Sequence, residues 1–67
     1  MTNSELEKFM SKHNVSAPEL AKILGVTRGA VLHWINGRRA VPEMARRLLV
    51  LFDESPDDMQ WFKELGE

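Results

Sequence analysis

The fold of this chain is decided by residues 16–37, which read SAPELAKILGVTRGAVLHWING. Ser16 with Glu19 three residues later is the pattern of a capping box, which predicts that a helix begins here. Apolar residues then recur at helical spacing as far as Gly25, a residue type that often takes the left-handed conformation ending a helix. Thr27 is a suitable N-cap for a second helix. The stretch therefore predicts two short helices joined by a tight turn.

Two helices across a short, glycine-containing turn form the helix-turn-helix pattern, whose second helix enters the DNA major groove. This helix would end at Asn36-Gly37 and face inward with Val31 and Trp34, which are three positions apart. Arginine bonds guanine bidentately, and leucine suits a thymine methyl group. We therefore expect base readout from the outward residues Arg28, Gly29, Leu32 and His33.

Two of these outward residues leave an alternative open. Leu32 would serve equally well by packing against the fourth helix or against another subunit. Gly29 would allow the helix to approach the bases closely, or it is simply tolerated near a helix cap, where glycine costs up to about 1 kcal/mol relative to alanine.

Three further helices follow from capping and periodicity. The first would run from a cap at Thr2, Asn3 or Ser4 to about Lys12. The fourth would start at Val41-Pro42, with the inward stripe Val41, Ala45, Leu48 and Phe52. The fifth would begin at Pro56 after a Ser55 cap and run to about Leu65, where Gly66 stops it. Because no segment alternates as a strand does, we predict an all-α fold of five short helices in one domain, residues 1–67.

Composition restricts the class of protein. The chain has 67 residues, of which 43% are hydrophobic and 28% charged, as in an ordinary folded domain. It has no cysteine, so neither a disulfide framework nor a thiolate zinc site is expected. No apolar run approaches the roughly 18 residues of a membrane span, and the polar, acidic start is unlike a signal peptide. We expect a soluble protein in the cytoplasm of a bacterial or phage-infected cell.

The net charge of −1 conceals a separation of charge along the chain. Residues 22–47 carry six basic residues against Glu43, whereas residues 48–67 carry Lys63 against six acidic residues. A basic middle with an acidic tail favours a polyanionic partner, although either half alone would pass as a solvated face. Lys22 is predicted to extend the phosphate-binding surface. Arg46 and Arg47 would extend it too, or would instead pair with Glu43 or the acidic tail.

Residues 24–39, which read LGVTRGAVLHWINGRR, resemble the signature of Cro/C1-type (lambda-repressor-like) helix-turn-helix domains. The resemblance extends from about Leu6 to Phe52 and implies five short helices. It implies base contacts from Arg28, Gly29 and His33. It also implies contacts to the DNA backbone from Ser16, Ala17, Thr27, Asn36, Arg38 and Arg39.

The sequence departs from this family at three positions. Ala17 stands where the family often has a glutamine that binds phosphate, so only backbone amides and the helix dipole would serve there. Ile35 replaces the usual glutamate, which suggests extra packing. Gly29 has no side chain for readout.

We predict a sequence-specific, autoregulatory repressor that binds a palindromic operator of double-stranded DNA as a homodimer. Such short chains resemble phage or mobile-element regulators, including anti-CRISPR-associated repressors. The last two helices carry more apolar residues than so small a domain can bury. They predict a dimer interface of Leu49, Val50, Leu51, Phe52, Met59, Trp61 and Phe62.

Two other readings stay open: an antitoxin that also binds a toxin, and a protein-interaction module that does not bind DNA. An enzyme is not predicted, because His13 and His33 lie on either side of a whole helix and no phosphate loop or hydrolase motif is present. No cofactor or metal is predicted either. The acidic residues 53–58 lack a glycine-bearing ligand loop and are better explained as a helix start.

Overall fold

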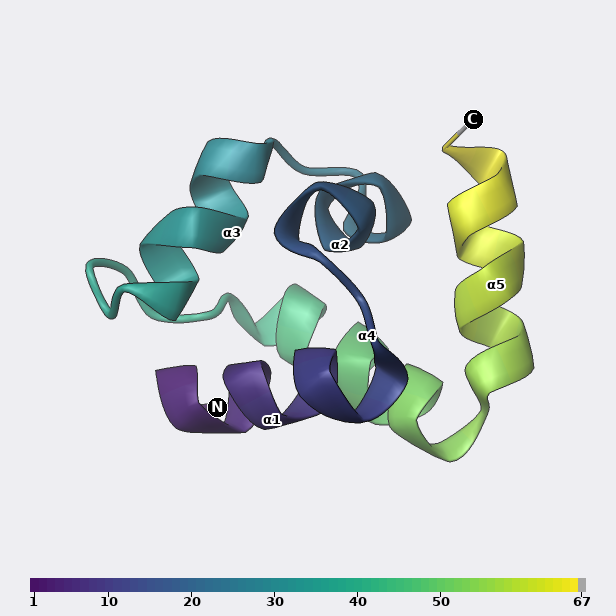
Figure 1. Ribbon diagram of the computed structural model, residues 1–67, viewed down its shortest axis with the longest axis horizontal. Coiled ribbons are helices and arrows are strands. Elements are labelled where there is room, and N and C mark those ends of the chain that lie inside the picture. The colour runs from purple at the N-terminus through teal and green to yellow at the C-terminus, as the bar shows by residue number, and fades with distance from the viewer. Residues whose placement is uncertain (67) are drawn as a thin grey trace.

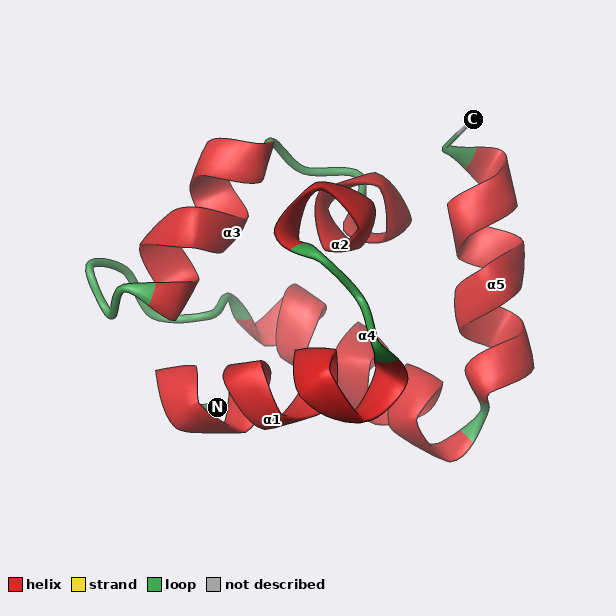
Figure 2. Cartoon of the chain, viewed as in Figure 1, coloured by secondary structure: helices red, strands yellow, loops and turns green. Residues whose placement is uncertain are grey.

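The computed structural model describes residues 1–66 and folds them into five α-helices, with no strand in that range (Figures 1 and 2). The helices are α1 (Asn3–His13), α2 (Ala17–Leu24), α3 (Arg28–Ile35), α4 (Glu43–Glu54) and α5 (Pro56–Leu65). The predicted all-α fold is confirmed. None of the helices in the described range is long and apolar enough to cross a membrane.

The turn between α2 and α3 forms through the predicted signals. The Gly25 backbone is left-handed, with φ 72° and ψ 34°, and the N–H of Val26 donates to the carbonyl of Ala21 at 3.0 Å. Thr27 Oγ1 accepts a hydrogen bond from the N–H of Ala30 at 3.1 Å, which caps α3. These bonds satisfy backbone groups that a helix end leaves unpaired. They therefore fix where α2 ends and α3 begins.

The start of α2 forms only half of the predicted capping box. Ser16 Oγ accepts from the N–H of Glu19 at 3.3 Å, as expected. The Glu19 carboxylate, however, accepts from the Ser16 hydroxyl at 3.2 Å, and a capping box would place it on the Ser16 backbone N–H.

The starts of α4 and α5 also differ from the prediction. Pro42 is the N-cap of α4, with an extended ψ of 152°, so the helix begins at Glu43. Ser55 both ends α4 and precedes α5, and with φ −136° and ψ 81° it makes no side-chain cap for α5. Its N–H donates to the carbonyl of Leu51 at 2.8 Å, and its carbonyl accepts from the N–H of Asp58 at 3.0 Å. The link between the two helices is therefore held by backbone bonds.

The core is assembled from α1 to α4 and closed by α5. Its fully buried large side chains are Leu6, Leu20, Val31, Leu49 and Phe52. The ring of Phe62 on α5 packs edge-on against Phe52, with 5.1 Å between ring centroids. Half-buried Met59 and Ile35 also pack against the core, so Ile35 contributes packing as its apolar character suggested. Met59 and Phe62 are thus the apolar residues through which α5 packs against the core.

The inward face of α4 is rotated relative to the prediction. Ala45, Leu49 and Phe52 are buried, and Leu48 is only half-buried. Leu49 and Phe52 have no exposed area, so the prediction that they belong to a dimer interface is wrong. Both side chains belong to the hydrophobic core of the chain.

Gly66 follows α5 at a point of close contact with α2. Its φ is −81°, so it is not a left-handed stop. A Cβ at this position would lie 2.8 Å from the carbonyl oxygen of Lys22, which is closer than real Cβ contacts. Glycine therefore lets the end of α5 approach the last turn of α2.

Replacing Leu49 tests the rotation of α4. We expect Leu49→Ala to lower the free energy of unfolding by about 2–5 kcal/mol, because the change empties a fully buried site. Leu65→Ala is the matched control, since Leu65 is 64% exposed, and it should cost less than about 0.5 kcal/mol. Urea denaturation followed by circular dichroism measures both. Equal losses would contradict the packing described.

Candidate nucleic-acid interface

The rotation of α3 is set by two buried side chains. Val31 is fully buried and Trp34 is 5% exposed, which confirms that they face inward. Arg28 and Gly29 are exposed in the first turn of the helix, and Leu32 is 42% exposed. Leu32 therefore keeps a large part of its side chain open to solvent. His33 is half-buried at the edge of this face. The four predicted base-reading residues thus share the outward part of α3.

The turn after α3 brings two arginines back to the last helical turn. Gly37 adopts a φ of 75°, which favours glycine. The N–H groups of Arg38 and Arg39 both donate to the carbonyl of His33, at 2.9 and 3.3 Å. Both side chains are exposed, as is Asn36 at the end of the helix. The arginines are consequently fixed close to the C-terminal end of α3 by their own backbone.

Asn3 is a positioning residue that the sequence did not reveal. Its side-chain amide Nδ2, at the start of α1, donates to the carbonyl of Ile35 at 3.4 Å. This bond spans 32 positions along the chain, so no local spacing could have indicated it. It ties the end of α3 to α1 beside the turn that carries the arginines.

Glu43 forms ion pairs with two of the basic residues of α4. Its carboxylate accepts from Arg46 Nε at 3.0 Å and also contacts Arg46 Nη2. Arg47 Nε lies 3.3 Å from the same carboxylate. The hydrogen bonds from Arg46 lower the pKa of Glu43 to about 2. Of the two predictions for Arg46 and Arg47, pairing with Glu43 is the one the structure shows.

The remaining basic residues of the middle segment have no such partner. No ion pair found within residues 1–66 includes Lys22, Arg28, Arg38 or Arg39. Arg28, Arg38 and Arg39 are associated with α3, whereas Lys22 borders a groove formed with the end of α5. An external anion would therefore meet uncompensated charge at both ends of α3.

At the helix starts that the resemblance assigned to the DNA backbone, Ser16 and Thr27 are exposed and Ala17 is half-buried, but both hydroxyl groups are already used. Ser16 bonds Glu19, and Thr27 Oγ1 accepts from the N–H of Ala30. Lys63 of α5 lies 3.5 Å from the Glu19 carboxylate and offsets its charge. What these positions can offer to a phosphate is the backbone amides and the positive end of the helix dipole.

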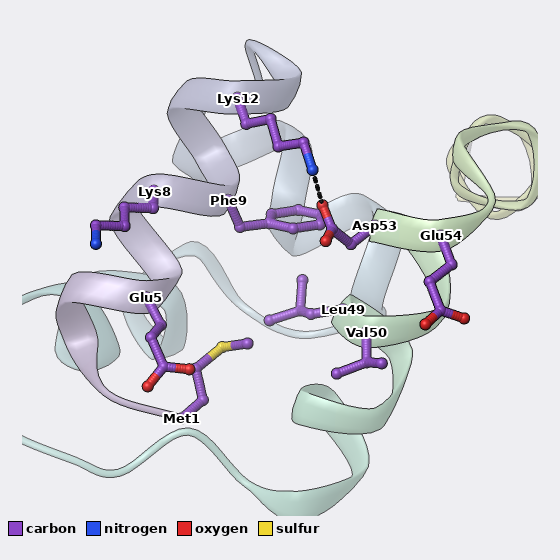
Figure 3. Close-up of a pocket in the computed structure, with 9 residues that line it drawn as sticks. All are labelled: Met1, Glu5, Lys8, Phe9, Lys12, Leu49, Val50, Asp53 and Glu54. Atoms are coloured by element: carbon purple, nitrogen blue, oxygen red, sulfur yellow. Dashed lines mark hydrogen bonds and ion pairs between the residues drawn. The ribbon is translucent and has the colours of Figure 1, made fainter.

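A cavity of about 310 Å³ lies between α1 and α4, away from α3 (Figure 3). Met1, Phe9, Leu49 and Val50 make part of its lining apolar. At its edge Lys12 Nζ lies 2.9 Å from the Asp53 carboxylate, and His13 Nε2 lies 3.0 Å from the same oxygen. The hydrogen bonds from Lys12 and His13 lower the pKa of Asp53. No cluster of side chains suited to hold a metal occurs within residues 1–66.

Two capped helices across a glycine turn, the second with an exposed face flanked by arginines, define a small helix-turn-helix domain. Comparison with known families agrees with this geometry. The helix-turn-helix family model HTH_3 matches residues 6–59, and the chain belongs to this Cro/C1-type helix-turn-helix family.

A curated relative comes from Thermococcus gammatolerans and is named "Putative HTH-type transcriptional regulatory protein". It is 44% identical to this chain over 50 residues, which cover 73% of the chain and 16% of the relative. The chain thus spans less than a fifth of that protein's length. No solved structure matches the chain.

The Glu43 cluster predicts a contribution to stability that depends on pH. Because folding lowers the pKa of Glu43 from 4.5 to about 2, its contribution is complete above pH 4.5 and is lost as the pH falls toward 2. Glu43→Gln should therefore be less stable than the wild type at neutral pH, and the difference should shrink in acid. Urea midpoints across this range measure it. Glu7→Gln, an exposed change on α1, is the control, and a difference that does not change with pH would contradict the prediction.

Proposed function

We propose that this protein is a sequence-specific DNA-binding transcription regulator that inserts α3 into the major groove. The observation that carries the proposal is the exposed face of α3, with Arg28 at one end and Arg38 and Arg39 at the other, none of them paired to a carboxylate within residues 1–66. Its family and the name of its archaeal relative support the same function.

Base readout falls to the outward residues of α3. Arg28 is in the first turn, the part of a recognition helix that contacts base edges. Its guanidinium suits the O6 and N7 acceptors of guanine, and exposed Leu32 suits a thymine methyl group. His33 would bond a base edge or a phosphate.

Phosphate binding falls to groups around the recognition helix. Arg38, Arg39 and Asn36 would bind the backbone beyond the C-terminal end of α3. The backbone amides at Ala17 and Thr27 would bind it at the starts of α2 and α3. Such contacts fix the register of the protein on the duplex without carrying sequence information.

We further propose that the protein acts as a homodimeric repressor on a palindromic operator. A twofold dimer presents two copies of α3 to half-sites roughly 10–10.5 bp apart, or a multiple of that spacing. Occupying a promoter, including its own, needs no catalytic step. The apolar residues still available for a dimer contact are exposed Val50, Leu51 and Trp61, with Met59 and Phe62 half-buried beside them.

Alanine substitutions at Arg28 and Arg38 should separate readout from phosphate binding. The probe is the duplex selected by the wild-type protein from a random-sequence pool at fixed salt. Arg28→Ala should cost about 1–3 kcal/mol of binding free energy and relax the preference at one base pair. Arg38→Ala should weaken binding to all duplexes and reduce the slope of log K against log salt by about 1.

Fluorescence anisotropy over a salt series measures these effects. Lys8→Ala, an exposed change on α1, is the control and should leave affinity unchanged. If no duplex were enriched, or if Arg28→Ala and Arg38→Ala both bound like the wild type, the proposal of DNA binding would fail.

Gly29→Ala should change stability and DNA affinity in opposite directions. In the free protein an added Cβ meets only Thr27 Oγ1, at 3.9 Å, so alanine fits and should stabilise α3 by up to about 1 kcal/mol. If α3 lies close to the base edges, the same methyl group should weaken binding to the selected duplex. Thermal unfolding and anisotropy measure the two effects. Undiminished affinity would mean that Gly29 is not a point of close approach.

A further inference from the structure

The outer face of α4 is exposed and apolar at its middle. Val50 is 43% exposed, Leu51 42% and Met44 74%. Two opposite charges lie on the same face, Arg47 one turn before Val50 and Glu54 one turn after it. Exposed apolar residues gathered on one face and bordered by charges are typical of an interaction surface.

The order of charges on this face makes it complementary to itself. In a twofold dimer every contact occurs twice: if residue i of one copy contacts residue j of the partner, then residue j of that copy contacts residue i of the partner. When two copies of α4 lie antiparallel with the axis between Val50 and Leu51, Arg47 precedes the axis by as many positions as Glu54 follows it. Each Arg47 therefore lies opposite a Glu54, and each Val50 opposite a Leu51.

We propose that two copies of this chain pair through antiparallel α4 helices centred between Val50 and Leu51, with Arg47 of each copy bonded to Glu54 of the partner subunit. This inference rests on the proposed homodimer and names its surface. Two symmetric ion pairs around an apolar centre would fix both the register and the orientation of the helices.

Both charged groups are available for such a contact. The Arg47 side chain is 71% exposed and reaches Glu43 through a single contact at 3.3 Å. Glu43 is held more firmly by Arg46, so it keeps a cation when Arg47 turns toward a partner. Glu54 is exposed and takes part in none of the ion pairs found among residues 1–66.

The cavity between α1 and α4 adds apolar surface beside this centre. Val50 and Glu54 lie along its rim, and Met1, Phe9 and Leu49 line its interior (Figure 3). Leu49 has no exposed area and Phe9 is only 6% exposed, so half-buried Met1 is the residue of this lining that would add apolar contact to Val50 and Leu51.

The outer face of α5 is the competing surface, and its charges disfavour self-association. Trp61 is 57% exposed and Leu65 64%. An antiparallel twofold contact centred on Trp61 would place Asp58 opposite Glu64, which brings like charges together. Lys63, the one basic residue of α5, already lies 3.5 Å from Glu19. The self-complementary charges of α4 therefore favour it as the dimer surface.

Charge reversal tests the pairing in sedimentation experiments without DNA. The wild type should be dimeric at micromolar concentration. Arg47→Glu and Glu54→Arg should each weaken the dimer about tenfold or more, because each places like charges opposite one another. Mixing the two variants should restore a dimer, since the heterodimer regains both ion pairs, and the double variant should dimerise alone. Circular dichroism checks that every variant is folded.

Two controls separate this proposal from its alternatives. Glu64→Arg, an exposed reversal on α5, should leave the dimer unchanged. A dimer that survives Arg47→Glu and Glu54→Arg but is lost in Trp61→Glu would place the interface on α5 and overturn the proposal. A monomeric wild type, or a mixture that stays monomeric, would also overturn it. The sedimentation experiment contains no DNA, so it tests the dimer independently of DNA binding. If the protein dimerised through α4 but bound no duplex, the proposed DNA binding would be refuted and the proposed dimer would stand.

Discussion

The burial of Val31 and Trp34 is the constraint on which the rest of the site depends. Helix α3 is short, so these two side chains are its buried anchors, and they decide which residues point to solvent. At 3.6 residues per turn, a shift of one position would rotate the helix by roughly 100° and replace Arg28 and Leu32 on the outer face. The readout surface is therefore a consequence of core packing on the opposite side of the same helix.

Backbone hydrogen bonds and caps fix the ends of α3, whereas the core fixes its rotation. The left-handed Gly25 and the Thr27 cap set the angle at which α3 leaves α2, and Gly37 returns the chain so that Arg38 and Arg39 bond the carbonyl of His33. The placement of α3 and of the two arginines therefore depends on local turn geometry. It requires no additional apolar side chains, which are few in a small domain. Such a division suits a chain of 67 residues, in which few side chains can be spared for anything but the core.

Local signals explain how much of this could be predicted from the sequence. The α2–turn–α3 unit follows from the Thr27 cap and from Gly25, which act within a few residues. The bounds of α5 agree with the prediction, but the Ser55 side-chain cap does not form and Gly66 is not left-handed. The rotation of α4 could not be predicted in the same way, because Leu48, Leu49, Val50 and Leu51 are all apolar and periodicity does not distinguish them. Packing against segments distant in the sequence decides it, since Leu49 is fully buried and Leu48 is only half-buried. The bond from Asn3 to Ile35 and the contact of Gly66 with Lys22 likewise join distant segments.

The distribution of charge in space reconciles a slightly acidic chain with a polyanionic partner. Helices α3 and α5 lie at opposite ends of the long axis of the molecule (Figure 1). The arginines around α3 are unpaired within the described chain, whereas the carboxylates of Asp57, Asp58 and Glu64 belong to α5. Because screening at physiological salt acts over about 8 Å, each end presents its own field to an approaching molecule. A duplex would be drawn to the α3 end and repelled from α5, so the acidic helix orients the encounter.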